Sequence, residues 1–453
     1  MGGASLSRSR VATNATLGAF ALVALVALGW TAETGKPLPL LVPAVAVAIF
    51  AATYRVALQW RVLVGTLIVV ILFIPIRRYT LPSGLPFELE PYRLLVAVLT
   101  LCWLGALLAE PEKVRFPKSP INAPIVLILG AILGSIAVNA HLIGDSGISD
   151  VVAKKVTFFL SFVAVAYLVG SVIRTREQVI AAVKVLVVGG SIVAAFAILE
   201  SRTGHNQFND LQHYIPFLKI QGQEVLVGGA LVERTTRARA YVTAQHPIAL
   251  GAAMVVLLPL ALYLVRATGR RFWFAAAALL FTGAIGSISR TPFLMLVAVG
   301  IVIIWFKPRE ARRAAPLVLV MLVVVHAAIP GALGGIKNAF MPTGGLVAEQ
   351  KKNAGGAGSG RVADLGPALE EWSRYPLLGE GFGTRITPPD TRANAMILDN
   401  QWLASLIEGG AIGVFAFGWL FVRAVRRLRR VARKDGDGEM GWLATSLAAS
   451  ITA

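Results

Sequence analysis

Residues 272–306 read FWFAAAALLFTGAIGSISRTPFLMLVAVGIVIIWF, two apolar runs (272–288 and 292–306) joined by a short connection that contains Arg290. The hydrocarbon core of a membrane, about 30 Å thick, takes roughly 20 apolar residues of helix. A backbone in lipid has to satisfy its own hydrogen bonds, so apolar runs of this kind are expected to be helices. This stretch therefore predicts a pair of membrane helices.

Similar apolar runs recur along the whole chain, bounded by polar clusters. They lie near 16–30, 38–53, 62–76, 93–109, 121–138, 156–173, 179–199, 241–265, 314–330 and 400–422. A last run from Trp442 to Ala453 is short for a span. We expect an all-α polytopic membrane protein with about twelve transmembrane helices, a partial thirteenth at the C-terminus and two longer extracytoplasmic loops.

The composition excludes several classes of protein. Of the 453 residues, 56% are hydrophobic and only 15% are charged, which excludes intrinsic disorder and is too apolar for an ordinary soluble protein. A single cysteine, Cys102, excludes a disulfide scaffold. We attribute the net charge of +19 to basic loops beside an anionic membrane or to anionic lipid substrates, and expect no nucleic-acid partner.

The basic loops predict the orientation. With the N-terminus inside, the Lys- and Arg-rich loops alternate onto the cytoplasmic side, and the densest basic run, Arg423 to Lys434, follows the last full span. The first apolar run follows Arg8 and Arg10 and is interpreted as an uncleaved anchor. The expected divisions are N-terminal helices 1–199, a first outer loop 200–240, core helices 241–330, a second outer loop 331–398 and a C-terminal membrane region 399–453.

The first outer loop ends in ERTTRARAYVTAQHPIALG (233–251), which carries Arg234, Arg237 and Arg239 before His246. Guanidinium groups are planar forks that match phosphate oxygens, so three of them at a helix mouth suit a diphosphate. A basic stretch that binds lipid headgroups is the alternative. The outer side is where such charge is usually depleted, which favours a functional role.

Arg290 lies between two apolar runs, next to Ser287, Ser289 and Pro292. A charge at membrane depth costs about 2.5–3.5 kcal/mol on insertion scales and usually faces a cavity or a partner. The alternative is an arginine whose head reaches the membrane interface. We favour a functional site.

The second outer loop contains SGRVADLGPALEEWSRYPLLGEGFGT (359–384). Val362, Leu365, Leu369 and Trp372 recur at helical spacing and predict an amphipathic helix over 361–374 that lies on the membrane surface. The glycines from Gly379 to Gly383 allow close approach of the backbone.

The chain returns to the membrane through ILDNQWLASLIEGGAIG (397–413). Asp399 and Asn400 precede the last full span, where a helix cap is the alternative role for Asp399. Glu408 falls inside the span, where a carboxylate needs a partner. Arg290, or the pair Arg237 and Arg239, would serve. His205, Asp210 and His213 do not match structural zinc spacing, so neither a metal nor a cofactor is expected.

Four motifs in this order resemble the bacterial O-antigen ligase and polymerase superfamily. They are RAxAYxxxxHPIALG, SISRTP, SGRxxxxxxAxxxW with PLLGEGFG, and DNxxLxxLxExGxxG, within residues 230–425. The resemblance implies a GT-C-like membrane glycosyltransferase. Such an enzyme takes a glycan from a polyprenyl diphosphate on the outer face of the cytoplasmic membrane and transfers it to an acceptor hydroxyl, as a polymerase or a ligase.

The resemblance also implies roles for individual residues. Arg237 or Arg239, together with Arg290, match the arginines that hold the donor diphosphate. Arg361 and the GEGFG run with Gly381 match the loop that covers the site. Ligases commonly have a histidine before the Asn of the last motif, where this chain has Asp399, so a carboxylate base is expected. The expected catalytic residues are Asp399, Arg290 and Arg239, and the expected substrate-binding residues are Arg237, Arg234, His246, Arg361, Gly381, Asn400 and Glu408.

The expected partners are the lipid-linked glycan donor, a glycan or lipid-glycan acceptor and membrane lipids. A flippase or transporter for lipid-linked oligosaccharides is the alternative, because many helices and basic groups also fit that class. Transporters tend to show repeat symmetry and broken helices at the midplane. No repeat at a fixed period is visible in this sequence.

Overall fold

The computed structural model describes residues 59–81, 89–109, 114–215, 218–220, 239–329, 364–387, 394–395, 398 and 400–453. The chain divides into two compact units, Met1–Thr66 and Leu67–Ala453. Of the first unit, only the start of α3 (Trp60–Phe73) is described. The predicted spans 16–30 and 38–53 lie outside the described residues, as do Arg234, Arg237, Arg361 and Asp399.

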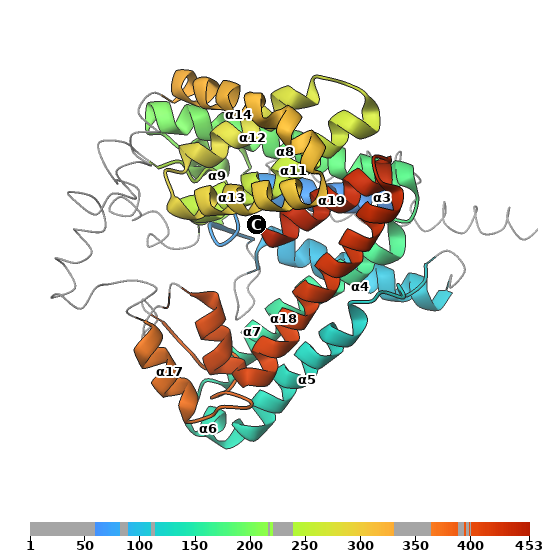
Figure 1. Ribbon diagram of the computed structural model, residues 1–453. Coiled ribbons are helices and arrows are strands. Elements are labelled where there is room, and N and C mark those ends of the chain that lie inside the picture. Colours follow the sequence, from blue (N-terminus) through green and yellow to red (C-terminus); the bar gives the residue numbers. More distant parts are fainter. Residues whose placement is uncertain are drawn as a thin grey trace, which may run out of the picture. The chain divides into compact units, whose positions relative to one another are not determined.

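The described part of the second unit is built from helices and almost no sheet (Figure 1). The larger helices are α4 (Pro91–Ala109), α5 (Asn122–Val138), α7 (Ser149–Val172), α8 (Arg176–Thr203), α11 (Pro247–Thr268), α12 (Trp273–Gly286), α13 (Arg290–Phe306), α14 (Pro308–Ala328), α17 (Leu365–Ser373), α18 (Gln401–Asp435) and α19 (Glu439–Thr452). Shorter elements are α6 (Ala140–Asp145), a 3-10 turn at Gln207–Asp210 and α9 (Leu211–Tyr214). Two strands of two residues, β1 (Tyr79–Thr80) and β2 (Lys219–Ile220), pair antiparallel with Tyr79 opposite Ile220.

Within the described ranges, five helices are long and apolar enough to cross a membrane: α4, α7, α8, α11 and α18. Each of them overlaps a predicted run. The other apolar helices are shorter, at 10–17 residues, and include α5, α12 and α13. The chain is therefore a multi-pass membrane protein. The predicted count of about twelve spans is not confirmed, because these shorter helices fall below the roughly 20 residues of a perpendicular span.

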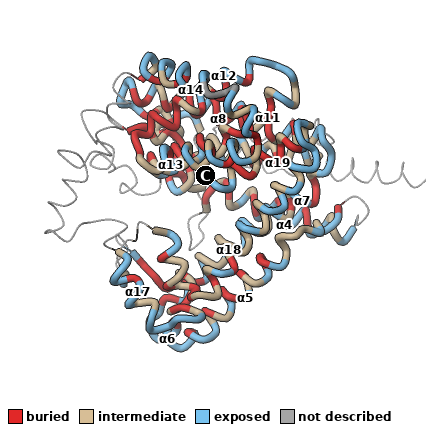
Figure 2. The backbone as a smooth tube through the Cα atoms, in the orientation of Figure 1, coloured by how far each residue is buried: buried red, intermediate tan, exposed pale blue. Residues whose placement is uncertain are grey.

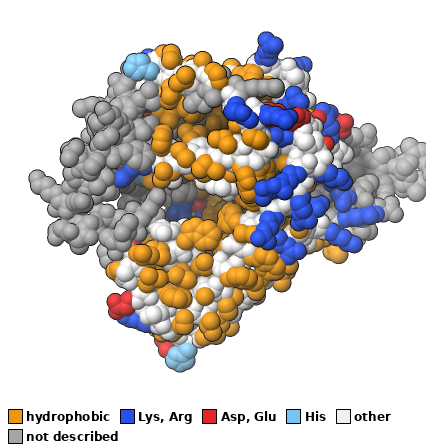
Figure 3. Space-filling view, in the orientation of Figure 1, with side chains coloured by type: hydrophobic (Ala, Val, Ile, Leu, Met, Phe, Trp, Pro, Cys, Tyr) orange, Lys and Arg blue, Asp and Glu red, His pale blue; other side chains and the backbone are white. Residues whose placement is uncertain are grey.

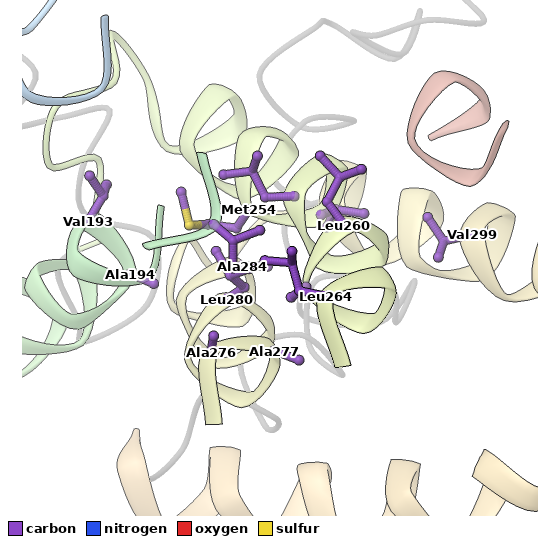
Figure 4. Packing of buried hydrophobic residues seen from close by; sticks show 14 of the residues in the cluster. Val193, Ala194, Met254, Leu260, Leu264, Ala276, Ala277, Leu280, Ala284 and Val299 are labelled. Carbon is purple, nitrogen blue, oxygen red and sulfur yellow. The ribbon is translucent and has the colours of Figure 1, made fainter. Parts of the chain in front are cut away.

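The main core lies where α8, α11 and α12 pack against one another, with α13 and α19 against α11. Figure 4 shows Ala194 of α8, Met254 and Leu264 of α11, and Leu280 of α12 converging in this cluster. The same helices carry much of the buried backbone in Figure 2. Small residues allow helices in a membrane to approach closely.

Close packing of this kind is visible at Gly283 of α12. A Cβ placed on Gly283 would come within 2.8 Å of the Cβ of Ala194. The α8–α12 contact therefore depends on two small residues that face each other.

A second set of helices is organised by α18, whose 35 residues make it the longest described helix. α5 packs along the N-terminal half of α18, and α19 folds back against its C-terminal half (Figure 1). α17 also packs against α18, through Ala368 beside Leu403 and Ile407. α17 lies within the stretch 361–374 for which an amphipathic surface helix was predicted; its Ala368 is buried, while Leu365 and Leu369 are exposed.

Candidate functional site

The helix α18 is interrupted at Gly410, whose φ of 64° and ψ of −170° are not helical. An interruption leaves backbone N–H and C=O groups without their usual partners, and in a membrane these groups have to be satisfied inside the protein. The loop after α17 supplies the partners. The hydrogen bonds run from Ala411 N to Pro376 O (2.9 Å), from Ile412 N to Leu377 O (3.2 Å) and from Glu380 N to Ile407 O (2.9 Å). The motifs PLLGEGFG and LIEGGAIG are therefore joined to each other by backbone hydrogen bonds.

Two glycines make this backbone contact possible. Gly410 and Gly379 both have positive φ, which favours glycine. A Cβ on Gly410 would lie 2.2 Å from the carbonyl oxygen of Leu377, and a Cβ on Gly379 would lie 2.4 Å from that of Ile407. No side chain larger than hydrogen fits at either position unless the opposing backbone moves.

Side chains of α5 and of the residue that follows it also bond to these two motifs. The Ser135 hydroxyl donates to the carbonyl oxygen of Glu408 at 2.7 Å, and the Asn139 amide donates to that of Gly379 at 3.0 Å. Both side chains are buried. The break in α18 is thus fixed by hydrogen bonds from two separate segments.

Glu408 lies two residues before the interruption at Gly410, and its carboxylate is 3.6 Å from Lys155 Nζ of α7. Lys155 Nζ also donates to the carbonyl oxygen of Arg385 at 2.5 Å. The sequence predicts a cationic partner for Glu408, with Arg290 or the pair Arg237 and Arg239 as candidates. The partner seen here is Lys155, which was missed because the pair Lys154 and Lys155 near the start of an apolar helix gives no specific signal.

Arg385 lies in the same loop and is almost fully buried. Its guanidinium makes an ion pair with Glu371 of α17 and lies 3.6 Å from the carboxylate of Glu380. Burial, and then the negative charge of Glu371, raise the pKa of Glu380 to about 7, although Arg385 acts in the opposite direction. One guanidinium thus lies between two carboxylates beside the break in α18.

A cavity of about 490 Å³ opens between α5, α7, α18 and the loop 382–387. Lys155, Arg385 and Glu408 line it together with phenylalanines of α7 and α18. Gly381, which the resemblance assigned to the covering loop, is buried at a φ of 120° and forms part of the turn that positions Phe382 and Arg385.

Arg239 and Arg290 meet the same connection, the one between α12 and α13. The Arg239 side chain is 1% exposed and its Nε donates to the carbonyl oxygen of Ser287 at 3.2 Å. Ala240 N donates to the carbonyl oxygen of Gly286 at 3.4 Å, so the chain at 239–240 lies along this connection. Arg290 is the first residue of α13, directly after it. We call Arg239, Arg290 and the connection 287–289 the arginine cluster.

The backbone around the arginine cluster is strained. Val242 and Ile288 have φ values of 46° and 45°, although β-branched residues rarely adopt positive φ. Val242 follows Arg239 by three residues, and Ile288 precedes Arg290 by two. Strain of this kind persists only where the surroundings fix it, and it gathers at functional sites.

A buried polar network fixes the strained segment at Val242. Glu200, at the end of α8, accepts hydrogen bonds from Tyr241 N (3.3 Å) and Val242 N (2.8 Å). Arg78 donates to the carbonyl oxygens of Val242 and Ala244, both at 2.9 Å. Burial lowers the pKa of Arg78, and the nearby acidic groups oppose this shift. Neither Arg78 nor Glu200 was a candidate from the sequence, because polar residues at the ends of apolar runs give no specific signal.

His246 caps the N-terminus of α11: its Nδ1 accepts from Ile248 N at 3.2 Å. Asn400 does the same for α18, with its side chain accepting from Trp402 N at 3.0 Å.

The predicted site residues that are described lie in two groups on different helices. Arg239, His246 and Arg290 surround the first turns of α11 and α13, whereas Gly381, Asn400 and Glu408 belong to α18 and its loop. Across the described ranges no group of three or more His, Cys, Asp or Glu could hold a metal ion.

The first turns of α11 and α13 touch at Gly251. A Cβ on Gly251 would lie 2.3 Å from Pro292 Cγ and 2.6 Å from the Ser287 hydroxyl. We expect Gly251→Ala to lower the free energy of unfolding by about 1–3 kcal/mol, because a packed interface has to move. Thermal unfolding in one detergent measures this. Gly300→Ala in α13 is the matched control, since a Cβ there meets nothing within 4 Å; equal behaviour of the two variants would contradict the close contact.

A comparison with protein families identifies residues 275–418 as a match to the O-antigen ligase family. The matched stretch contains most of α12, all of α13, α14 and α17, and the first half of α18. It therefore includes Arg290, the loop after α17 and Glu408. No curated protein matches the chain. The resemblance predicted from the ordered motifs is confirmed over this stretch.

Proposed function

We propose that this membrane protein, whose residues 275–418 match the O-antigen ligase family, moves a glycan from a polyprenyl-diphosphate donor to an acceptor hydroxyl. The observation that carries the proposal is the arginine cluster. A buried arginine from one segment and an arginine from the family-matched region meet one short connection. Guanidinium groups suit a diphosphate, because each offers a planar set of donors to phosphate oxygens.

In the proposed reaction the acceptor oxygen attacks the first carbon of the donor glycan, and the bond from that carbon to the diphosphate oxygen breaks. The electron pair of that bond leaves with the polyprenyl diphosphate. Arg239 and Arg290 stabilise the negative charge that develops on the leaving oxygen. The acceptor hydroxyl gives its proton to a carboxylate, for which Asp399 is our candidate. Asp399 directly precedes Asn400, the cap of α18.

The charge distribution supports the proposed orientation. Figure 3 shows Lys and Arg side chains gathered over the C-terminal half of α18, where Arg426, Arg427, Arg430 and Arg433 are exposed. Basic residues flanking a membrane span favour the cytoplasmic side. α18 begins at the opposite end, beside the loop after α17. We therefore propose that this loop lies outside the cytoplasmic membrane.

A lipid-linked oligosaccharide transporter is the alternative, and the break in α18 is an observation in its favour. In transporters, the ends of broken helices point at the substrate. Here both ends at Gly410 bond to the loop 376–380, so the break supports the protein backbone and leaves few backbone groups for cargo. This difference favours the enzyme.

The test is transfer by the purified protein in detergent, with a polyprenyl-diphosphate-linked oligosaccharide and a glycan acceptor. We expect a new glycosidic product and free polyprenyl diphosphate, measured by mass spectrometry. Detergent removes the two compartments, so a transporter would form no covalent product. Absence of product in detergent, combined with movement of the same lipid across proteoliposomes, would establish the transporter.

A further inference from the structure

The lining of the cavity beside the break in α18 changes from polar at one end to apolar at the other. Three helices contribute to this change. On α18 the lining begins with Gln401, Ser405 and Glu408 and continues with Gly413 and Phe417. On α7 it begins with Lys155 and continues with Phe162. α5 runs the other way: Ser135 bonds to the carbonyl oxygen of Glu408, and Ile128 lies two turns earlier. One end of the cavity is therefore polar and the other is apolar.

The apolar end is lined mainly by aromatic rings. Phe159 of α7 makes edge-to-face contacts with Phe382 at 6.1 Å and with Phe417 at 6.2 Å between ring centroids. Phe158 and Phe162 extend the same surface along α7. An apolar wall between membrane helices suits a hydrocarbon chain. The volume of about 490 Å³ is enough for part of a chain together with a headgroup.

The polar end has nearly balanced charge. Lys155 is paired with Glu408 at 3.6 Å, and Arg385 lies between Glu371 and Glu380. The arginine cluster differs, since its two named charges are both positive. A headgroup of uncharged hydroxyls can donate to the carboxylates and accept from the Lys and Arg groups. A diphosphate would add negative charge next to Glu408 without a surplus of positive charge to meet it.

We propose that this cavity binds an uncharged glycolipid, with the sugar at the Lys155–Glu408 end and the hydrocarbon chain along the phenylalanines of α7. The assignment of the cavity as the acceptor site rests on the proposed function, whereas the binding of a glycolipid there does not depend on it. In that role the cavity would hold the molecule whose hydroxyl receives the glycan, while the arginine cluster holds the donor. The enzyme would thus separate its two substrates by headgroup charge.

The experiment protects a cysteine in the cavity from modification. In a Cys102→Ser background, Ser405→Cys places a thiol at the polar end, and Ser373→Cys places one on the exposed end of α17 as the matched control. The full-length protein in nanodiscs is treated with a maleimide in the presence of dodecyl maltoside, below the concentration that dissolves the discs. Dodecyl phosphocholine, with the same chain and a zwitterionic head that carries a phosphate in place of sugar hydroxyls, is the comparison. Thermal unfolding checks that each variant is folded.

We expect dodecyl maltoside to slow the labelling of the cysteine at 405 about tenfold, at a concentration about ten times its dissociation constant. Labelling at 373 and labelling in dodecyl phosphocholine should stay near the unprotected rate. Ala404→Phe, which fills the lining, should remove the protection. Equal protection by both amphiphiles, or no protection by either, would overturn the proposal. Protection without glycan transfer would leave the cavity assigned and refute the proposed function, whereas transfer without protection would do the reverse.

Discussion

Replacing Arg290 by alanine should lower kcat for glycan transfer by about 10²–10³-fold, the usual effect of removing one donor that stabilises developing charge. The reason is the position of Arg290 at the α12–α13 connection, which the buried Arg239 also contacts. The double variant Arg239→Ala/Arg290→Ala should lose more than either single variant but less than the product of the two losses, because groups that act on one leaving group are not independent. Transfer of labelled glycan by purified protein gives kcat and KM.

The matched control is Arg309→Ala, which removes an exposed arginine of α14. We expect it to leave both constants unchanged. Arg290→Lys should recover only part of the rate, because an ammonium group keeps the charge and loses the planar pair of donors. Full activity of the double variant would end the assignment of the arginine cluster to the donor diphosphate.

Gly410→Ala should lower the free energy of unfolding by about 2–5 kcal/mol, since it combines a strained backbone with an overlap of atoms. At φ 64° an alanine is disfavoured, and its Cβ would lie 2.2 Å from the carbonyl oxygen of Leu377. The loop 376–380 then has to move, and the hydrogen bonds from Ala411 N and Ile412 N are weakened. Thermal unfolding of the two proteins in the same detergent measures the difference.

The neighbouring Gly409 provides the control for this prediction. A Cβ at 409 meets nothing within 4 Å and its φ is not positive, so Gly409→Ala should be tolerated. Gly379→Ala should resemble Gly410→Ala, because it opposes the same backbone from the other side. If Gly409→Ala and Gly410→Ala proved equally harmless, this would contradict the interruption of α18 at Gly410.

The sequence alone determined which segments are helices and which family the chain resembles. Apolar runs have one stable backbone in lipid, so runs such as 241–265 and 400–422 identified α11 and α18 without knowledge of any contact. Charges at membrane depth are costly, which singled out Arg290 and Glu408 as candidates, and basic residues are usually depleted on the outer side, which singled out Arg239. The motif order predicted the family, which the match at 275–418 confirms.

Only the tertiary structure decided how these pieces pair. That PLLGE supplies the hydrogen bonds missing at Gly410 is not encoded in any periodicity, because a backbone N–H looks the same at every position of a sequence. The partner of Glu408 came from α7, more than two hundred residues earlier, as Lys155. Helix identity depends on local composition and solvent, whereas the satisfaction of buried polar groups depends on which distant segment the fold brings within hydrogen-bonding reach.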